Sequence, residues 1–178
     1  MSSSPAGQVA EVELIPDFAS LLRQHQRMVF TIALHMVRDP MAAEEIAQDV
    51  FLKLHQELRS MKSSAHIEFW LRRVAVHRAI DYERKHRHDP NVALEELQMP
   101  AKEEPGTDPF LARRLQALVA SLPEKARAVV VLRYQEELMP EEIAALLRIP
   151  VGTVKSHLQR SLAMLREKLG RTLGEVSL

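Results

Sequence analysis

Cysteine is absent from this chain of 178 residues, so neither a disulfide nor a thiolate metal site can support the fold. Aromatic residues make up 4% of the sequence and glycine occurs five times, which argues against a sheet-rich protein. No apolar run approaches the roughly 20 residues that a membrane-spanning helix requires. The start, MSSSPAGQ, lacks the charged and apolar parts of a secretory signal and is typical of a flexible tail. We therefore expect a cytoplasmic protein without membrane insertion.

Hydrophobic residues make up 46% of the chain, with leucine, alanine and valine prominent, and this composition favours helices. The formal net charge is +0, with the basic stretches 66–88 and 148–171 offset in large part by the acidic stretch 89–108. Several prolines and one glycine interrupt the acidic stretch, as in a linker. The predicted fold class is therefore all-α, with two small helical domains joined by a flexible acidic linker. The expected tail, first domain, linker and second domain are residues 1–16, 17–89, 90–110 and 111–174.

The second basic module has the pattern of a helix, a tight turn and a second helix. Ile143, Leu146 and Leu147 form a short apolar face, after which the Ile149-Pro150 pair interrupts the helix. Burial of the next leucine-rich face leaves six polar residues outside: Thr153, Lys155, Ser156, His157, Gln159 and Arg160. Hydroxyls and cations bind phosphates, while Arg and Gln can pair with guanine and adenine edges in the major groove. The pattern favours a DNA-recognition helix over its alternative, a plain helical hairpin.

The first module shows three apolar stripes at helical spacing, which predict a three-helix unit. Its third helix carries the basic run after Trp70, which is either a solvated face or a surface for single-stranded nucleic acid. Trp70 falls on the apolar stripe and is expected in the core, so the adjacent Phe69 is the better candidate for stacking on a base. The polar loop Lys62–His66 either cups an extruded base or only connects two helices. His25 is expected to be a packing residue of the first helix.

Catalysis lacks a candidate site in this sequence. There are no paired carboxylates, no nucleophile elbow and no glycine-rich phosphate loop. The His86-x-His88 pair has no third ligand at helical spacing, and its cationic surroundings oppose a divalent metal. We expect no enzyme activity, no cofactor and no metal. A small metal-dependent hydrolase that uses these histidines is kept as an alternative.

Taken together, the modules resemble the bacterial extracytoplasmic-function sigma factors, the group of RNA polymerase sigma factors that has only the sigma-2 and sigma-4 domains. The resemblance runs from Asp17 to about Gly170 and rests on three blocks. The block Ala43–Phe51 is similar to the family's acidic helix that docks on the polymerase clamp. The block Phe69–Arg84 looks like the segment that opens the −10 element, and Glu142–Arg160 is like the helix-turn-helix that reads the −35 element.

The resemblance implies a promoter-specificity subunit that binds core RNA polymerase, through its clamp coiled coil and its flap, and promoter DNA, with an anti-sigma factor as a further partner. The residues that it implies for polymerase binding are Glu45, Gln48, Asp49, Phe51 and Leu52. Those implied for the −10 element are Lys62, Ser63, Ser64, His66, Phe69, Arg73, His77, Arg78, Arg84 and Arg87. Those implied for the −35 element are Thr153, Lys155, Ser156, His157, Gln159 and Arg160. The acidic linker is expected to thread toward the active cleft or RNA exit path, with Glu95, Glu96, Glu103 and Glu104 mimicking RNA phosphates.

Four positions depart from the family's pattern, and one of them is His157, where Arg is frequent. His77 stands where Asn is usual, and Arg148 replaces the glycine of the helix-turn-helix bend, at a cost on the order of 1 kcal/mol if it is left-handed. Met139 replaces the Ser or Thr that usually caps the next helix, a loss typically of about 1 kcal/mol. The main rival interpretation is a free-standing helix-turn-helix regulator whose DNA-binding domain spans residues 123–170. That rival leaves the 48–51 block and the basic run after Trp70 without a function.

Overall fold

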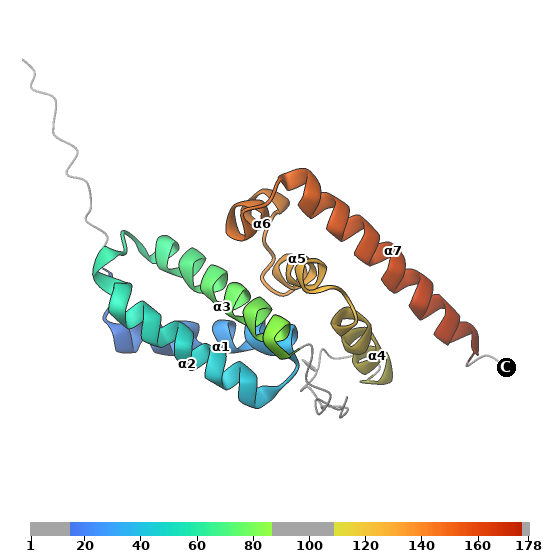
Figure 1. Cartoon of the computed structure of the whole chain (residues 1–178), viewed down its shortest axis with the longest axis horizontal. Helices are drawn as coiled ribbons and strands as arrows, with labels where there is room; N and C mark the ends of the chain where they lie inside the picture. The colour runs from blue at the N-terminus through green and yellow to red at the C-terminus, as the bar shows by residue number, and fades with distance from the viewer. Residues whose placement is uncertain (1–14, 87–108, 176–178) are drawn as a thin grey trace, which may run out of the picture.

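The structure, a computed structural model, describes residues 15–86 and 109–175, with side chains described up to residue 170. All regular elements in these ranges are helices, which confirms the predicted all-α class (Figure 1). Helices α1–α3 form the first domain and α4–α7 the second. Most of the predicted linker and most of the predicted tail lie outside the described residues, as do Arg87, His88 and the four linker glutamates whose role was predicted.

The first domain consists of α1 (Phe18–Val37), α2 (Pro40–Glu57), a 3₁₀ turn (Leu58–Ser60) and α3 (Ser64–His86). Asp17 caps α1 because its carboxylate accepts a hydrogen bond from the Ser20 N–H at 3.0 Å. Asp39 caps α2 in the same way, accepting from the Met41 N–H at 2.9 Å, and Pro40 occupies the first helical turn. Helices α1 and α2 therefore start where an acidic side chain satisfies free backbone donors.

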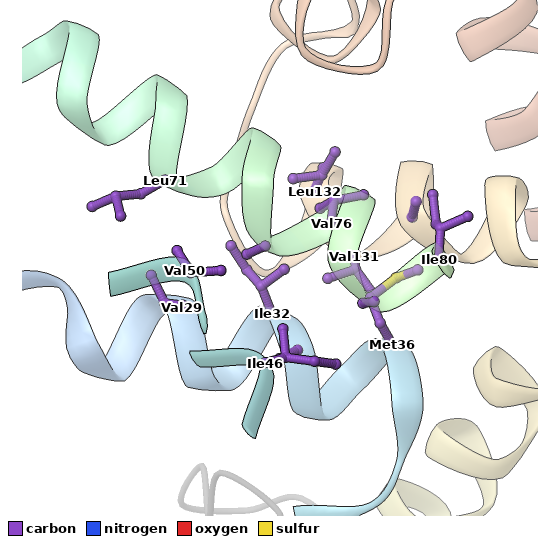
Figure 2. Close-up of a cluster of buried hydrophobic side chains, with 14 of the residues drawn as sticks. Val29, Ile32, Met36, Ile46, Val50, Leu71, Val76, Ile80, Val131 and Leu132 are labelled. Atoms are coloured by element: carbon purple, nitrogen blue, oxygen red, sulfur yellow. The ribbon is translucent and has the colours of Figure 1, made fainter. Parts of the chain in front are cut away.

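The core of this domain lies where the three helices meet. Val29 and Ile32 of α1, Val50 of α2, and Leu71 and other α3 residues are fully buried, as Figure 2 shows. Full burial of one such side chain stabilises the fold by about 1.5–3 kcal/mol relative to an exposed one. Trp70 and Phe69 are both partly buried against the core, so the predicted contrast between them is weaker than their spacing indicated.

The second domain contains α4 (Pro109–Ala120), α5 (Glu124–Tyr134), α6 (Pro140–Leu147) and α7 (Val151–Glu175). Arg148 ends α6 in the left-handed conformation, with φ 54° and ψ 48°, at the bend where the family has glycine. At the start of α6, the Glu142 carboxylate accepts a hydrogen bond from the Met139 N–H at 2.7 Å. An acid in the first turn therefore satisfies the backbone N–H of Met139 itself, the residue that stands where a Ser or Thr is usual.

The two domains are packed together. Helix α5 lies against α1 and α3, and α6 also contacts α3. One hydrophobic cluster runs through both domains: Val131 and Leu132 of α5 lie among Ile32, Met36 and Val76 (Figure 2). The sequence predicted two domains joined by a linker and carried no prediction about a contact between them.

Candidate nucleic-acid interface

Helix α7 buries an apolar face and exposes a polar one over its first turns. Val154 and Leu165 are buried in the second domain, and the Pro150 carbonyl starts the helix by accepting from the Thr153 N–H at 2.9 Å. Of the six residues predicted to read DNA, four are exposed and two are half-buried. The exposed ones are Thr153, Lys155, Gln159 and Arg160, and the half-buried ones are Ser156 and His157. The structure therefore gathers hydroxyl, amide and cationic groups on one end of a single helix.

An acidic residue of α6 lies next to this surface. The Lys155 Nζ is 3.4 Å from a Glu141 carboxylate oxygen, and both side chains are more than half exposed. An exposed ion pair of this kind contributes about 0–1 kcal/mol, so it is easily exchanged for a phosphate. The ion pair with Glu141 therefore orients the Lys155 side chain but does not prevent its ammonium from binding a phosphate instead.

The polar loop before α3 has its own hydrogen bonds. The Ser63 hydroxyl accepts from the His66 N–H at 3.1 Å, which caps α3. The His66 Nδ1 accepts from the Lys62 N–H at 3.3 Å, so in this arrangement Nδ1 carries no proton. Lys62 is exposed, while Ser63, Ser64 and His66 are half-buried. The loop is therefore held in shape at the start of α3, beside the partly buried Phe69.

A groove of about 240 Å³ lies between α2 and α3. It is lined by Lys53, Arg73, Val74, His77, Arg78 and Asp81. Three of the predicted −10 residues, Arg73, His77 and Arg78, meet here. The His77 Nδ1 lies 2.7 Å from the Arg73 carbonyl oxygen, and because a carbonyl can only accept, Nδ1 must carry the proton. In the neutral ring Nε2 is then an acceptor.

Lys53 belongs to this groove, although the sequence analysis did not single it out. It adds a cation from α2 to those that α3 supplies. The sequence feature that could have identified Lys53 is its position three residues after the buried Val50, because that spacing keeps a residue close to the packed side of a helix.

Arg84 lies at the other end of the predicted −10 surface. Its Nε is 3.4 Å from a Glu124 carboxylate oxygen of the second domain. The contact between the domains therefore engages a residue that was predicted to bind DNA.

Helix α2 presents an exposed face opposite the core. Glu45, Gln48, Asp49 and Leu52 fall together at helical spacing, and Leu52 is 59% exposed. Phe51 does not share this face, because it is only 6% exposed and packs in the core at the edge of the buried stripe. Its assignment to polymerase binding is corrected: the side chain supports α2 from inside and does not face a partner.

Two histidines lie on α1, inside the first domain. His25 is buried and His35 half-buried, and burial lowers the pKa of each below its ordinary value of 6.5. For His25, the nearby Glu68 raises the pKa and Arg72 lowers it, and both effects are smaller than that of burial. Both rings therefore favour the neutral form, and we assign them no contact with DNA.

The described residues offer neither a helix that could span a membrane nor a cluster of side chains that could hold a metal ion. No helix within residues 15–86 or 109–175 combines the length and apolar character needed to cross a membrane. The same residues contain no cluster of three or more His, Asp or Glu side chains able to hold a metal ion. His88 of the predicted His86-x-His88 pair lies outside them.

Comparison with known proteins identifies the class. Residues 21–88 match the family described as Sigma-70 region 2, and residues 112–165 match the family described as Sigma-70, region 4. These ranges coincide with the first and second domains. The chain is therefore a sigma factor of the sigma-70 type, a non-enzymatic subunit of RNA polymerase that recognises promoters through these two regions.

Similar proteins identify the group of sigma factors to which this chain belongs. The ECF RNA polymerase sigma factor SigW of Bacillus subtilis is 31% identical over 165 residues, which cover 85% of this chain and 88% of SigW. The RNA polymerase sigma-E factor of Streptomyces coelicolor is 32% identical over 155 residues, which cover 86% of each chain. This chain belongs to the extracytoplasmic-function (ECF) sigma factors.

Two solved structures share the fold at 19% identity. The sigma factor RpoE of Bartonella quintana, in complex with the anti-sigma factor NepR, has a TM-score of 0.70 and covers 88% of this chain and 98% of its own. CnrH, in complex with the cytosolic domain of CnrY, has a TM-score of 0.63 and covers 86% of this chain and 88% of its own. Below, region 2 denotes α1–α3 and region 4 denotes α4–α7.

Proposed function

We propose that the polar end of α7 enters the major groove of the −35 element while α3 and the loop before it hold the opened −10 strand. The observation that carries this proposal is the clustering of exposed Thr153, Lys155, Gln159 and Arg160 on a helix whose other face is buried. Gln159 and Arg160 supply donors suited to base edges. Thr153 and Lys155, nearer the helix start, bind phosphates, aided by the free backbone N–H groups there.

The groove between α2 and α3 holds the backbone of the opened strand. Lys53, Arg73 and Arg78 provide cations for its phosphates, and Asp81 limits how deep an anion can sit. With Nδ1 donating to the Arg73 carbonyl, Nε2 of the uncharged His77 ring can accept a hydrogen bond from a base or sugar donor. The usual Asn both donates and accepts through its amide, whereas the His77 ring offers only the Nε2 acceptor in this tautomer. The loop Lys62–His66 receives an extruded base next to Phe69.

The exposed face of α2 docks on the clamp coiled coil of core polymerase, with Glu45, Gln48, Asp49 and Leu52 as contacts and Phe51 left out. Region 4 meets the polymerase flap. The chain works in the cytoplasm, where the polymerase acts on the chromosome. Since the solved structures of RpoE and CnrH hold NepR and the cytosolic domain of CnrY, we also assign an anti-sigma factor to this chain as a partner.

Transcription in vitro tests whether α7 reads the −35 element while α3 and the loop before it hold the −10 strand. Purified chain is combined with core polymerase and a library of genomic promoters, and each product is mapped. We expect initiation at a set of promoters that share both a −35 and a −10 sequence. The rival regulator predicts equal DNA binding with and without core polymerase and no initiation, and that result would refute the proposal.

A further inference from the structure

His77 is the histidine of the groove between α2 and α3, and its ring is held by one of its two nitrogens. Nδ1 lies 2.7 Å from the Arg73 carbonyl oxygen, one turn earlier in α3. Because a carbonyl can only accept, Nδ1 carries a proton whether the ring is neutral or charged. A change of protonation therefore takes place at Nε2, the ring nitrogen farther from the backbone, and the hydrogen bond that orients the ring is kept.

The charged groups that face His77 come from both helices of the groove. Lys53 belongs to α2, and Arg73, Arg78 and Asp81 belong to α3. With three cations and one acid already in the groove, a proton on Nε2 adds to positive charge that a bound anion neutralises. A phosphate placed there favours the protonated ring, and by thermodynamic reciprocity the protonated ring favours the phosphate.

His66, the other histidine among the predicted −10 residues, has the opposite arrangement. Its Nδ1 accepts a hydrogen bond from the Lys62 N–H at 3.3 Å, so a proton on Nδ1 would remove an acceptor that holds the loop in shape. Acid therefore loosens the loop at His66. At His77 the same proton leaves the existing hydrogen bond intact and adds a donor, so the two histidines change strand binding with opposite signs.

We propose that His77 couples capture of the opened −10 strand to the uptake of a proton. The neutral ring accepts a hydrogen bond at Nε2 from a base or sugar, whereas the protonated ring donates from Nε2 to a phosphate and adds a cation to Lys53, Arg73 and Arg78. The inference rests on the proposed function, because it assumes that the groove holds the opened strand. The strand therefore binds more tightly as the pH falls through the range in which histidines ordinarily titrate.

Binding of a labelled single strand to the holoenzyme tests this coupling. The probe is a fluorescent oligonucleotide that carries the non-template −10 strand of a promoter selected by the transcription assay, and anisotropy measures its affinity at pH 6, 7 and 8. We expect the affinity to rise by about fivefold from pH 8 to pH 6, because a charged donor makes a hydrogen bond roughly twice as strong as a neutral one. The salt dependence should also steepen at pH 6, by up to about 0.7 in the slope of log affinity against log salt, the value for one more neutralised phosphate of a single strand.

Variants of His77 separate its proton from every other pH effect in the holoenzyme. His77→Asn, which cannot be protonated in this range, should lose both the gain in affinity at pH 6 and the change in salt dependence. His77→Lys keeps a positive charge at every pH tested, so it should show the steeper salt dependence at pH 8 as well. His55→Asn, at an exposed position on α2 that does not line the groove, is the matched control and should respond to pH like the unmodified chain.

Two results would overturn the inference. One is a holoenzyme of unmodified chain that binds the strand no more tightly at pH 6 than at pH 8, and the other is a His77→Asn variant that keeps the whole gain. Weaker binding in acid that disappears in His66→Asn would assign the pH response to the loop and would overturn it as well. His25 and His35 are present in every variant, so their effect on stability cancels in these comparisons.

Failure of the proposed function gives a different result in the same assay. If Arg73→Ala with Arg78→Ala leaves strand binding by the holoenzyme unchanged at pH 8, the groove does not hold the opened strand and the proposed function fails there. If that double variant weakens binding while His77→Asn keeps the full pH response, the groove still holds the strand and only the coupling through His77 is refuted.

Discussion

Lys155, the first cation of α7, lies 3.4 Å from Glu141 of the preceding helix. Replacing Glu141 with Gln removes a negative charge beside the DNA surface and frees the ammonium for a phosphate. Since exposed pairs contribute up to about 1 kcal/mol, we expect −35-dependent transcription to rise by about two- to fivefold. Lys155→Ala should lower it by about tenfold.

The double variant separates the two effects. If Glu141 acts through Lys155, then Glu141→Gln should have no effect in a chain that already carries Lys155→Ala. The readout is transcription in a titration of salt, where Lys155→Ala should also reduce the salt dependence of promoter binding. A drop in activity on Glu141→Gln, with unfolding unchanged, would contradict this role.

Arg160 should behave differently, because it is assigned to a base edge. Arg160→Ala is expected to lower transcription by an amount that corresponds to about 1–3 kcal/mol and to relax the preference at one −35 base pair. The measurement is transcription from promoters that carry every single substitution in the −35 element. Arg166→Ala, exposed further along α7, serves as the control and should leave the preferences intact. Uniform weakening across all sequences would show that Arg160 binds phosphate and not a base.

On the polymerase side, Asp49→Lys reverses one charge in the exposed face of α2. We expect weaker binding to core polymerase and an unchanged fold, because the side chain is exposed and takes no part in the core. Competition with labelled unmodified chain for a limiting amount of core polymerase measures the effect, and circular dichroism checks the fold. Glu57→Lys, an exposed acid at the end of the same helix, should compete normally. Normal competition by Asp49→Lys would remove α2 from the docking surface.

Stability should fall on the acid side of neutrality. Burial lowers the pKa of His25 and His35 in the folded chain below the ordinary 6.5, so the unfolded chain binds more protons as the pH falls through that value. The free energy of unfolding therefore decreases as the pH drops below about 6.5, and these groups contribute no slope well above it. Urea unfolding at several pH values between 5 and 8 measures this. His25→Gln with His35→Gln should flatten the dependence, and an unchanged slope would show that other groups cause it.

Much of the fold follows from local pattern. The spacing of apolar residues predicted where the helices lie, and the Ile149-Pro150 pair predicted the bend. Both signals are local, because hydrophobic periodicity and helix-breaking residues act over only a few positions. The sequence attached a cost to Arg148 if that residue were left-handed, and the structure shows that it is, with φ 54°. Phe51 was misassigned because it lies at the edge of the buried stripe, where one residue's difference in helical angle decides between core and surface.

The contact between regions 2 and 4 could not be predicted from local sequence patterns. Arg127 and Glu83 are 44 positions apart, and neither has a local motif that predicts its partner. Arg127 in a sequence is an ordinary helix cation, and only the approach of α1 and α3 makes it a buried donor to Met36. Lys53 likewise lines the groove between α2 and α3 only because the fold places these two helices side by side.

Opening of the −10 element in a reconstituted system tests most directly whether the chain melts promoter DNA only together with core polymerase. A fluorescent base analogue in the non-template strand reports melting on promoter DNA with the purified chain, with core polymerase, and with both. The proposed mechanism predicts a signal only when both are present, and loss of that signal when Arg73 and Arg78 are replaced with Ala. Melting by the chain alone, or tight promoter binding that core polymerase does not change, would contradict it.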